Sequence, residues 1–321
     1  MKVDMSTQLS ALRLENPILT ASGCAASGKE LDRVFDLTTL GAMITKSIML
    51  EPRQGRPTPR MAETPAGMLN SIGLQGPGIE RFIAEDLVWL AERGVPTIAS
   101  IAGTHVHEYA ELTRRLRSAP AVVAIEVNIS CPNHDDRDHV FACYPEPAAK
   151  VIEAVRRSVP YDLPVFAKLS PDVTDIVEIA HAVIAAGADG LTLINTVLGM
   201  AIDPKTLRPV LSAGTGGLSG PAIRPIALRC IHQVRAALPE IPIIGVGGVT
   251  SGVDALTFLA AGANAVSVGT GVFSDPNAPA RISQELAHEL KSRGLTCVQE
   301  AVNLAHAQDS LESDSVVALH Q

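Results

Sequence analysis

The chain has 321 residues and a formal net charge of −8 at pH 7, from 34 acidic and 26 basic side chains. This charge disfavours broad nucleic-acid binding, because no positive field gathers phosphate groups. No apolar run reaches the roughly 18 residues of a membrane span, and no apolar segment follows the lysine near the amino terminus, so we expect neither a membrane anchor nor a signal peptide. The five scattered cysteines lack CxxC spacing, which predicts free thiols in a cytoplasmic protein without a bound metal.

Short apolar, β-branched runs alternate with amphipathic helical segments along the chain. After a possible hairpin at residues 6–14, strands are expected at residues 17–23, 42–46, 96–101, 122–128, 165–169, 190–195, 242–247 and 265–269. Helices are expected at residues 30–37, 79–92, 106–117, 146–158, 173–186, 222–238 and 252–261. The length allows one large barrel or two smaller domains. The uninterrupted alternation predicts a single (β/α)8 TIM barrel over residues 1–308, with a disordered tail at 309–321.

Two segments depart from this alternation. Residues 50–78 are rich in Pro, Gly and Arg and show no regular periodicity, and residues 196–220 form a polar, Gly-rich excursion. Long connections of this kind inside a compact domain are more often functional loops than filler. We expect the second segment to form a loop or hairpin over the barrel mouth.

The fourth expected strand ends in a cluster of polar residues. Asn128, Cys131 and Asn133 follow the apolar run within a few residues. Amides both donate and accept hydrogen bonds, which suits a flat ligand that carries carbonyl and N–H groups. The thiol between them suits proton transfer, but a buried and inert structural cysteine has the same sequence signal. Both interpretations stay open on this stretch alone.

Other strand ends also carry residues suited to a ligand, because active sites of such barrels lie at the carboxyl ends of the strands. Glycine-rich turns at 245–252 and 268–271 follow the last two strands, where backbone N–H groups can cradle a phosphate. Lys46 and Lys168 require a charged or electron-rich partner, unless they reach water or pair with acidic residues. His105 and His107 form an HxH that more often marks a solvated helix start than a metal site.

Five motifs together resemble the class 1 dihydroorotate dehydrogenases over residues 6–290. They are Thr-Lys-Ser at 45–47, Pro-Arg-Met-Ala-Glu-Thr-Pro-Ala-Gly-Met-Leu-Asn-Ser-Ile-Gly-Leu-Gln at 59–75, Asn-Ile-Ser-Cys-Pro-Asn at 128–133, Gly-Gly-Leu-Ser-Gly-Pro-Ala-Ile at 216–223 and Gly-Val-Gly-Gly-Val at 245–249. The sequence Glu-Thr-Pro-Ala-Gly-Met-Leu-Asn at 63–70 is most similar to class 1B, the NAD-linked type. In that class a partner subunit carries FAD and an iron–sulfur cluster.

The resemblance implies an FMN-dependent enzyme of pyrimidine biosynthesis that oxidises dihydroorotate to orotate. The implied catalytic residue is Cys131, as the general base. The implied substrate-binding residues are Lys46, Asn70, Asn128, Asn133, Asn195 and Thr196. The implied cofactor-binding residues are Ser22, Lys46, Ser47, Ser100, Asn128, Lys168, Ile194, Gly220, Gly247, Gly248, Gly269 and Thr270.

The resemblance further implies a homodimer or a heterotetramer with the electron-transfer subunit. Two departures from the family pattern stand out: Ser100 replaces an expected asparagine, and residues 134–143 differ from an expected Gly-rich loop. The alternatives are an FMN oxidoreductase of another dihydropyrimidine, a class 1A enzyme that reduces fumarate, a dihydrouridine synthase, a flavin-free phosphosugar isomerase and a non-catalytic flavin-binding subunit.

Overall fold

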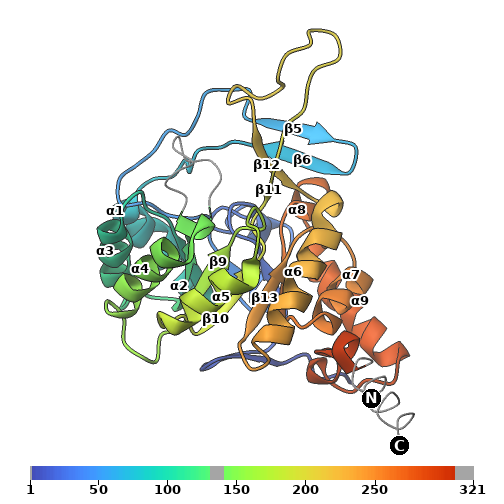
Figure 1. Ribbon diagram of the computed structural model, residues 1–321. Helices are drawn as coiled ribbons and strands as arrows, with labels where there is room; N and C mark the ends of the chain where they lie inside the picture. The colour runs from blue at the N-terminus through green and yellow to red at the C-terminus, as the bar shows by residue number, and fades with distance from the viewer. Residues whose placement is uncertain (1, 131–140, 308–321) are drawn as a thin grey trace, which may run out of the picture.

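The computed structural model describes residues 2–130 and 141–307, which form a parallel β-barrel surrounded by helices (Figure 1). The eight barrel strands, in spatial order, are β3 (Ile18–Thr20), β14 (Ala265–Val268), β13 (Ile243–Val246), β10 (Gly190–Leu193), β9 (Val165–Leu169), β8 (Val122–Asn128), β7 (Thr97–Ile101) and β4 (Met43–Ile44). A parallel bridge between Leu19 and Ala42 joins the two ends of this sheet. The predicted (β/α)8 barrel is therefore confirmed.

Helices cover the outside of the barrel, and most lie where the sequence predicts them. They are α1 (Ile79–Arg81), the π-helical η3 (Phe82–Leu87), α2 (Val88–Glu92), α3 (Val106–Leu116), α4 (Pro145–Arg156), α5 (Ile176–Ala185), α6 (Arg224–Ala237), α7 (Gly252–Ala260), α8 (Gly271–Ser274) and α9 (Ala278–Ser292). Short 3₁₀ turns complete the helical content at Leu31–Arg33, Leu37–Thr39, Phe141–Cys143, Pro221–Ile223, Val298–Ala301 and Leu304–His306.

The helix predicted at residues 30–37 is wrong. Two 3₁₀ turns occupy this stretch, at Leu31–Arg33 and Leu37–Thr39. The Asp36 carboxylate accepts a hydrogen bond from the Thr38 backbone N–H at 2.9 Å, so a new turn is capped where a continuous helix would run. Aspartate favours this local bond over a helix interior.

A hairpin closes the end of the barrel opposite the mouth, as the sequence suggests for residues 6–14. Strands β1 (Thr7–Leu9) and β2 (Leu12–Leu14) pair antiparallel, with Thr7 opposite Leu14. The hairpin's Leu9 and Leu14 are buried in the barrel interior. The cluster that they join consists of Leu19, Ala42, Ile44, Ile98, Ala124, Phe166, Ile244 and Ala265.

A second, antiparallel sheet lies over the barrel mouth and is called the roof sheet below (Figure 1). Its strands, in spatial order, are β11 (Val197–Gly199), β12 (Gly216–Ser219), β6 (Gly67–Asn70) and β5 (Met61–Thr64). The expected hairpin at 196–220 is present as β11 and β12. Residues 50–78, however, are not irregular throughout, because they contain β5 and β6. The sequence of these two strands lacks the hydrophobic pattern of a buried strand, because only Leu69 among their residues is buried.

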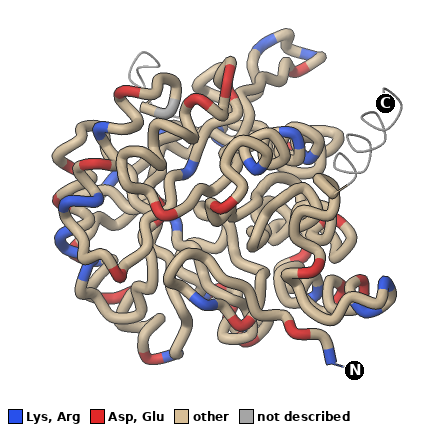
Figure 2. Tube along the Cα trace, turned by 60° about the horizontal axis from the view of Figure 1, so that its bottom comes forward, with Lys and Arg blue, Asp and Glu red and all other residues tan. Residues whose placement is uncertain are grey.

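Acidic and basic residues are interspersed along the chain in the view of Figure 2. No helix among residues 2–130 and 141–307 combines the length and the apolar character that a membrane crossing needs. Within this described part, Cys24, Cys230 and Cys297 are free cysteines.

Candidate active site

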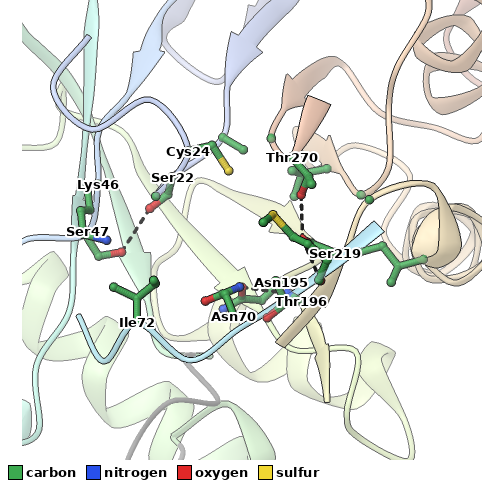
Figure 3. Close-up of a pocket in the computed structure, with 18 of the residues that line it drawn as sticks. Ser22, Cys24, Lys46, Ser47, Asn70, Ile72, Asn195, Thr196, Ser219 and Thr270 are labelled. Carbon is green, nitrogen blue, oxygen red and sulfur yellow. Dashed lines mark hydrogen bonds between the residues drawn. The ribbon is translucent and has the colours of Figure 1, made fainter. Parts of the chain in front are cut away.

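A cavity of about 340 Å³ lies between the carboxyl ends of the barrel strands and the roof sheet. Figure 3 shows Ser22, Lys46 and Ser47 along one wall, Ser219 and Thr270 along the other, and Asn70, Asn195 and Thr196 between them. The predicted site residues that line it are Ser22, Lys46, Ser47, Asn70, Asn128, Lys168, Ile194, Asn195, Thr196, Gly220, Gly247, Gly248, Gly269 and Thr270. Cys131 and Asn133 lie outside the described residues.

Three serine hydroxyl groups form a cluster at one wall of the cavity. The Ser47 Oγ lies 2.9 Å from the Ser100 Oγ and 3.2 Å from the Ser22 Oγ, and Ser22 also bonds to Ser100 at 3.1 Å. Ser22 and Ser47 line the cavity, but Ser100 is fully buried and does not. Ser100 is thus the one predicted cofactor-binding residue that does not line the cavity, and its assignment to the cofactor stays a prediction. Its short side chain ends in this cluster, where the longer asparagine would extend further.

Amide side chains form the part of the wall that follows β8 and β10. The Asn128 amide donates to Ser47 Oγ at 2.9 Å, and its backbone carbonyl accepts from the buried Tyr109 hydroxyl at 3.0 Å. The Asn195 amide donates to the Ser130 carbonyl at 2.9 Å. These bonds hold both amides at the cavity by means of partners from the segment after β4, from α3 and from the backbone after β8, which leaves little freedom for rearrangement.

The opposite end of the cavity is built from glycines and hydroxyl groups. Thr270 donates to Ser219 Oγ at 2.7 Å, which ties the loop after β14 to the roof sheet. Gly248 has a φ of +77°, and a Cβ there would lie 2.5 Å from the Gly220 carbonyl oxygen. Only glycine fits this turn, because it combines a left-handed backbone with a close contact between two backbones.

An arginine outside the cavity fixes that turn in place. Arg224, at the start of α6, donates from Nε to the Gly248 carbonyl at 3.0 Å. Its Nη1 lies 2.5 Å from the Asp254 carboxylate on α7, which also accepts from the Thr250 backbone N–H at 2.9 Å. The glycine turn is thus braced by an ion pair between two helices, and its backbone groups are held in a fixed orientation.

Two lysines reach the cavity from the barrel strands. Lys168 on β9 is only 5% exposed, and its Nζ lies 3.6 Å from Oε1 of Glu126 on β8. Lys46 follows β4 on the wall that carries Ser22 and Ser47. The cavity therefore combines two cationic groups and several amides with a glycine turn, and it can hold a planar, electron-rich ligand that bears an anionic group.

Comparison with known proteins assigns the family. The dihydroorotate dehydrogenase family model matches residues 4–290. The chain belongs to the dihydroorotate dehydrogenase family. A relative from Anoxybacillus flavithermus is 50% identical over 296 residues, which cover 92% of this chain and 94% of the relative.

Two further relatives agree with this assignment. One from Pelobacter propionicus is 50% identical and covers 94% of this chain and 98% of its own length. One from Listeria monocytogenes serotype 4a is 49% identical, covering 92% and 96%. All three carry the name "Dihydroorotate dehydrogenase B (NAD(+)), catalytic subunit". The resemblance to class 1B is thereby confirmed.

This dihydroorotate dehydrogenase family member also has cavity residues that the sequence pattern did not indicate. Cys24 lines the cavity beside Ser22, and burial raises the pKa of its thiol to about 11, against the opposing effect of Lys168 and Lys46. The roof sheet and the segments around it supply Arg60, Met61, Met68, Ile72, Leu74, Gln75 and Ser219. All of them except Ser219 lie in or beside β5 and β6, which the sequence did not indicate, whereas Ser219 ends the hairpin that was expected over the mouth.

The HxH motif is a helix start, as its more common interpretation predicts. His105 precedes α3, and its backbone N–H donates to the Glu108 carboxylate at 3.0 Å. Among the described residues, no group of three or more His, Cys, Asp or Glu side chains is arranged to hold a metal ion.

Proposed function

We propose that the chain oxidises dihydroorotate to orotate with FMN as hydride acceptor, as the catalytic subunit of an NAD-linked dihydroorotate dehydrogenase. One observation carries this proposal: a single cavity gathers the lysines, amides and glycine turn in a chain about 50% identical to enzymes of that name. The reaction belongs to pyrimidine biosynthesis.

The cavity fits FMN in its chemistry. Gly247, Gly248, Gly269 and Thr270 lie together at one end, where backbone N–H groups suit a phosphate. Lys168, Lys46 and the serine cluster lie toward the other end, where they suit the ring carbonyls and nitrogens of the flavin. When bound there, FMN supplies a two-electron acceptor for hydride.

The same cavity suits a small cyclic diamide that carries a carboxylate. We assign Asn70, Asn128, Asn133, Asn195 and Thr196 to hydrogen bonds with its ring amides and carboxylate, and Lys46 to its negative charge. Cys131 is assigned as the base that removes a proton from C5 while hydride leaves C6. Oxidation to the ring double bond requires both transfers, so a proton acceptor must lie beside the substrate.

A partner subunit completes the proposed enzyme. The relatives are named catalytic subunits of NAD-linked enzymes, which supports a partner subunit. The resemblance to class 1B implies that this partner carries FAD and an iron–sulfur cluster. Orotate formation by this chain alone would then require an artificial electron acceptor, and NAD reduction would require the partner. The proposed assembly is a homodimer of this chain, extended to a heterotetramer by two partner chains.

The first experiment is a visible spectrum of the purified chain, recorded anaerobically before and after addition of dihydroorotate. We expect a flavin spectrum that bleaches, with orotate formed in equal amount. A bound flavin that stays oxidised would reject dihydroorotate as the substrate. Folded protein that binds no flavin, even after incubation with FMN, would reject the proposal as a whole.

A further inference from the structure

Two oppositely charged side chains lie inside the barrel, one at the floor of the cavity and one beneath it. Glu126 on β8 is 0% exposed and Lys168 on β9 is 5% exposed. The strands pair in parallel with Asn128 opposite Lys168 and Glu126 opposite Phe166, so the lysine lies two residue pairs nearer the mouth. Lys168 lines the cavity, whereas Glu126 lies below it. The lysine therefore stands between the buried carboxylate and any ligand.

The hydrogen bonding of Glu126 is incomplete. Its Oε1 accepts from the Ser100 hydroxyl at 3.0 Å and lies 3.6 Å from Lys168 Nζ, while Oε2 has no hydrogen-bond partner among the described residues. A fully buried carboxylate with a free oxygen is costly to maintain. In a low-dielectric interior its charge also acts strongly on neighbouring charges.

A second path connects Glu126 to the cavity. Ser100, which bonds to the carboxylate, also bonds to Ser47 at 2.9 Å and to Ser22 at 3.1 Å. Both of these serines line the cavity. The carboxylate thus affects the cavity through the lysine on one side and through oriented hydroxyl groups on the other.

We propose that Glu126 is a positioning residue that sets the reduction potential of the bound flavin by partly neutralising Lys168. This inference rests on the proposed function. Hydride transfer from substrate delivers two electrons and one proton, so the reduced ring carries one more negative charge than the oxidised ring. Lys168 favours that added charge, and Glu126 opposes it. The substitution Glu126→Gln removes the opposing charge and favours the reduced form.

The test is the midpoint potential of the FMN-loaded chain, measured by anaerobic titration against a reference dye. Glu126→Gln keeps the shape of the side chain and is expected to raise the ratio of reduced to oxidised flavin at least about tenfold, which for a two-electron couple is a positive shift of about 30 mV. An unchanged or lowered potential in a folded, FMN-loaded variant overturns the inference.

A matched control separates charge from disturbance of the barrel interior. Thr192→Val alters a residue that is buried, uncharged and directly opposite Lys168 on β10, and whose hydroxyl also has no partner within the described part of the chain. Its potential is expected to match that of the unmodified chain. Equal shifts in both variants would assign the effect to packing and reject the role of the charge.

A second variant keeps the inference testable if Glu126→Gln does not fold. Glu126→Asp retains the charge but withdraws it from Lys168 by one methylene, and we expect a smaller positive shift of the midpoint potential. An unchanged potential would overturn the inference.

Failure of the proposed function has a different signature, because the unmodified chain would then lack flavin or would not bleach with dihydroorotate. Bleaching in every variant with equal potentials would reject only the role of Glu126.

Discussion

Cys24 is a thiol at the cavity wall whose reactivity is suppressed by its surroundings. Burial raises its pKa to about 11, and the charges of Lys168 and Lys46 only partly offset this effect. The fold therefore favours the neutral thiol. The protonated Cys24 thiol makes its full contribution to the free energy of unfolding at pH values below the pKa of an unfolded cysteine, about 8.5. This contribution is lost as the pH rises through about 11.

This shift predicts slow alkylation of Cys24 in the FMN-free protein. The thiolate is the nucleophile, and with a pKa of about 11 only about one Cys24 thiol in a thousand is ionised at pH 8. Peptide mapping after iodoacetamide treatment should show Cys24 labelled far more slowly than Cys297, which lies beside Asp4 away from the cavity. The rate at Cys24 should rise about tenfold per pH unit up to pH 11. Equal rates at pH 8 would contradict the raised pKa.

Cys131 is expected to behave differently, as the proposed base. Cys131→Ala should reduce turnover of dihydroorotate by about 10² to 10⁴, the usual contribution of general base catalysis, while FMN and orotate still bind. Cys297→Ala is the control and should leave turnover unchanged. The measurement is anaerobic flavin bleaching by stopped flow. Unimpaired turnover in the Cys131 variant would remove this residue from the role.

Individual site residues could be predicted from the sequence where a polar side chain lies at the end of an expected strand. Lys46, Asn128 and Lys168 stand out because polar groups directly follow or end apolar runs, and the structure brings all three to the cavity. Glu126 was missed although it precedes Asn128 by two positions, the spacing that puts both on one face of a strand. Its partner Ser100 lies on another strand, and such pairing depends on register that a single sequence does not specify.

At the scale of elements, the turn after β13 should be the most sensitive part of the cavity. Gly248→Ala places a Cβ 2.5 Å from the Gly220 carbonyl oxygen at a φ of +77°. We expect at least a tenfold loss of FMN affinity, because the turn must shift, and a loss of about 1–3 kcal/mol in the free energy of unfolding. Fluorescence titration with FMN and urea unfolding measure the two effects.

Gly94→Ala is a matched control for this change. Gly94 also has a positive φ, +68°, but no atom lies within 4 Å of a Cβ placed there. It precedes β7 at the end of the barrel opposite the cavity. Stability should fall by about 1 kcal/mol from backbone strain alone, with FMN affinity unchanged. A Gly248 variant that matched Gly94→Ala in both measurements would show that the close contact is unimportant.

Regular elements were predictable when their own hydrophobic pattern was strong. Strand β9, Val165–Leu169, has the bounds expected from sequence, because every one of its residues is buried. Strands β5 and β6 were not foreseen, since their stability depends on pairing with β12, far away in the sequence. The helix expected at 30–37 failed for a local reason, the side-chain bond of Asp36 to the backbone of Thr38.

At the scale of the whole molecule, the amino-terminal hairpin acts as a plug for the barrel. Leu9 is 0% exposed within the cluster at the closed end of the barrel. Leu9→Ala should lower the free energy of unfolding by about 2–5 kcal/mol, the usual cost of a buried leucine cavity. Leu12→Ala, at the partly buried position opposite Leu9, should cost much less. Equal losses in denaturant titrations would mean that the hairpin does not fill the barrel.

The pairing of β6 with β12 has a consequence for the order of events during synthesis. The Asn70 amide donates to the Gly217 carbonyl across 147 residues of sequence, and Thr270 secures the same sheet from the far side. Contacts of such high contact order form late, because a long loop must close first. The first half of the chain contains β5 and β6 but not β11 and β12, so the complete roof sheet cannot form before the second half is translated. The cavity is complete only after Thr270 has been translated, directly after the last barrel strand, so closure of the barrel and completion of the cavity depend on the same late segment of the chain.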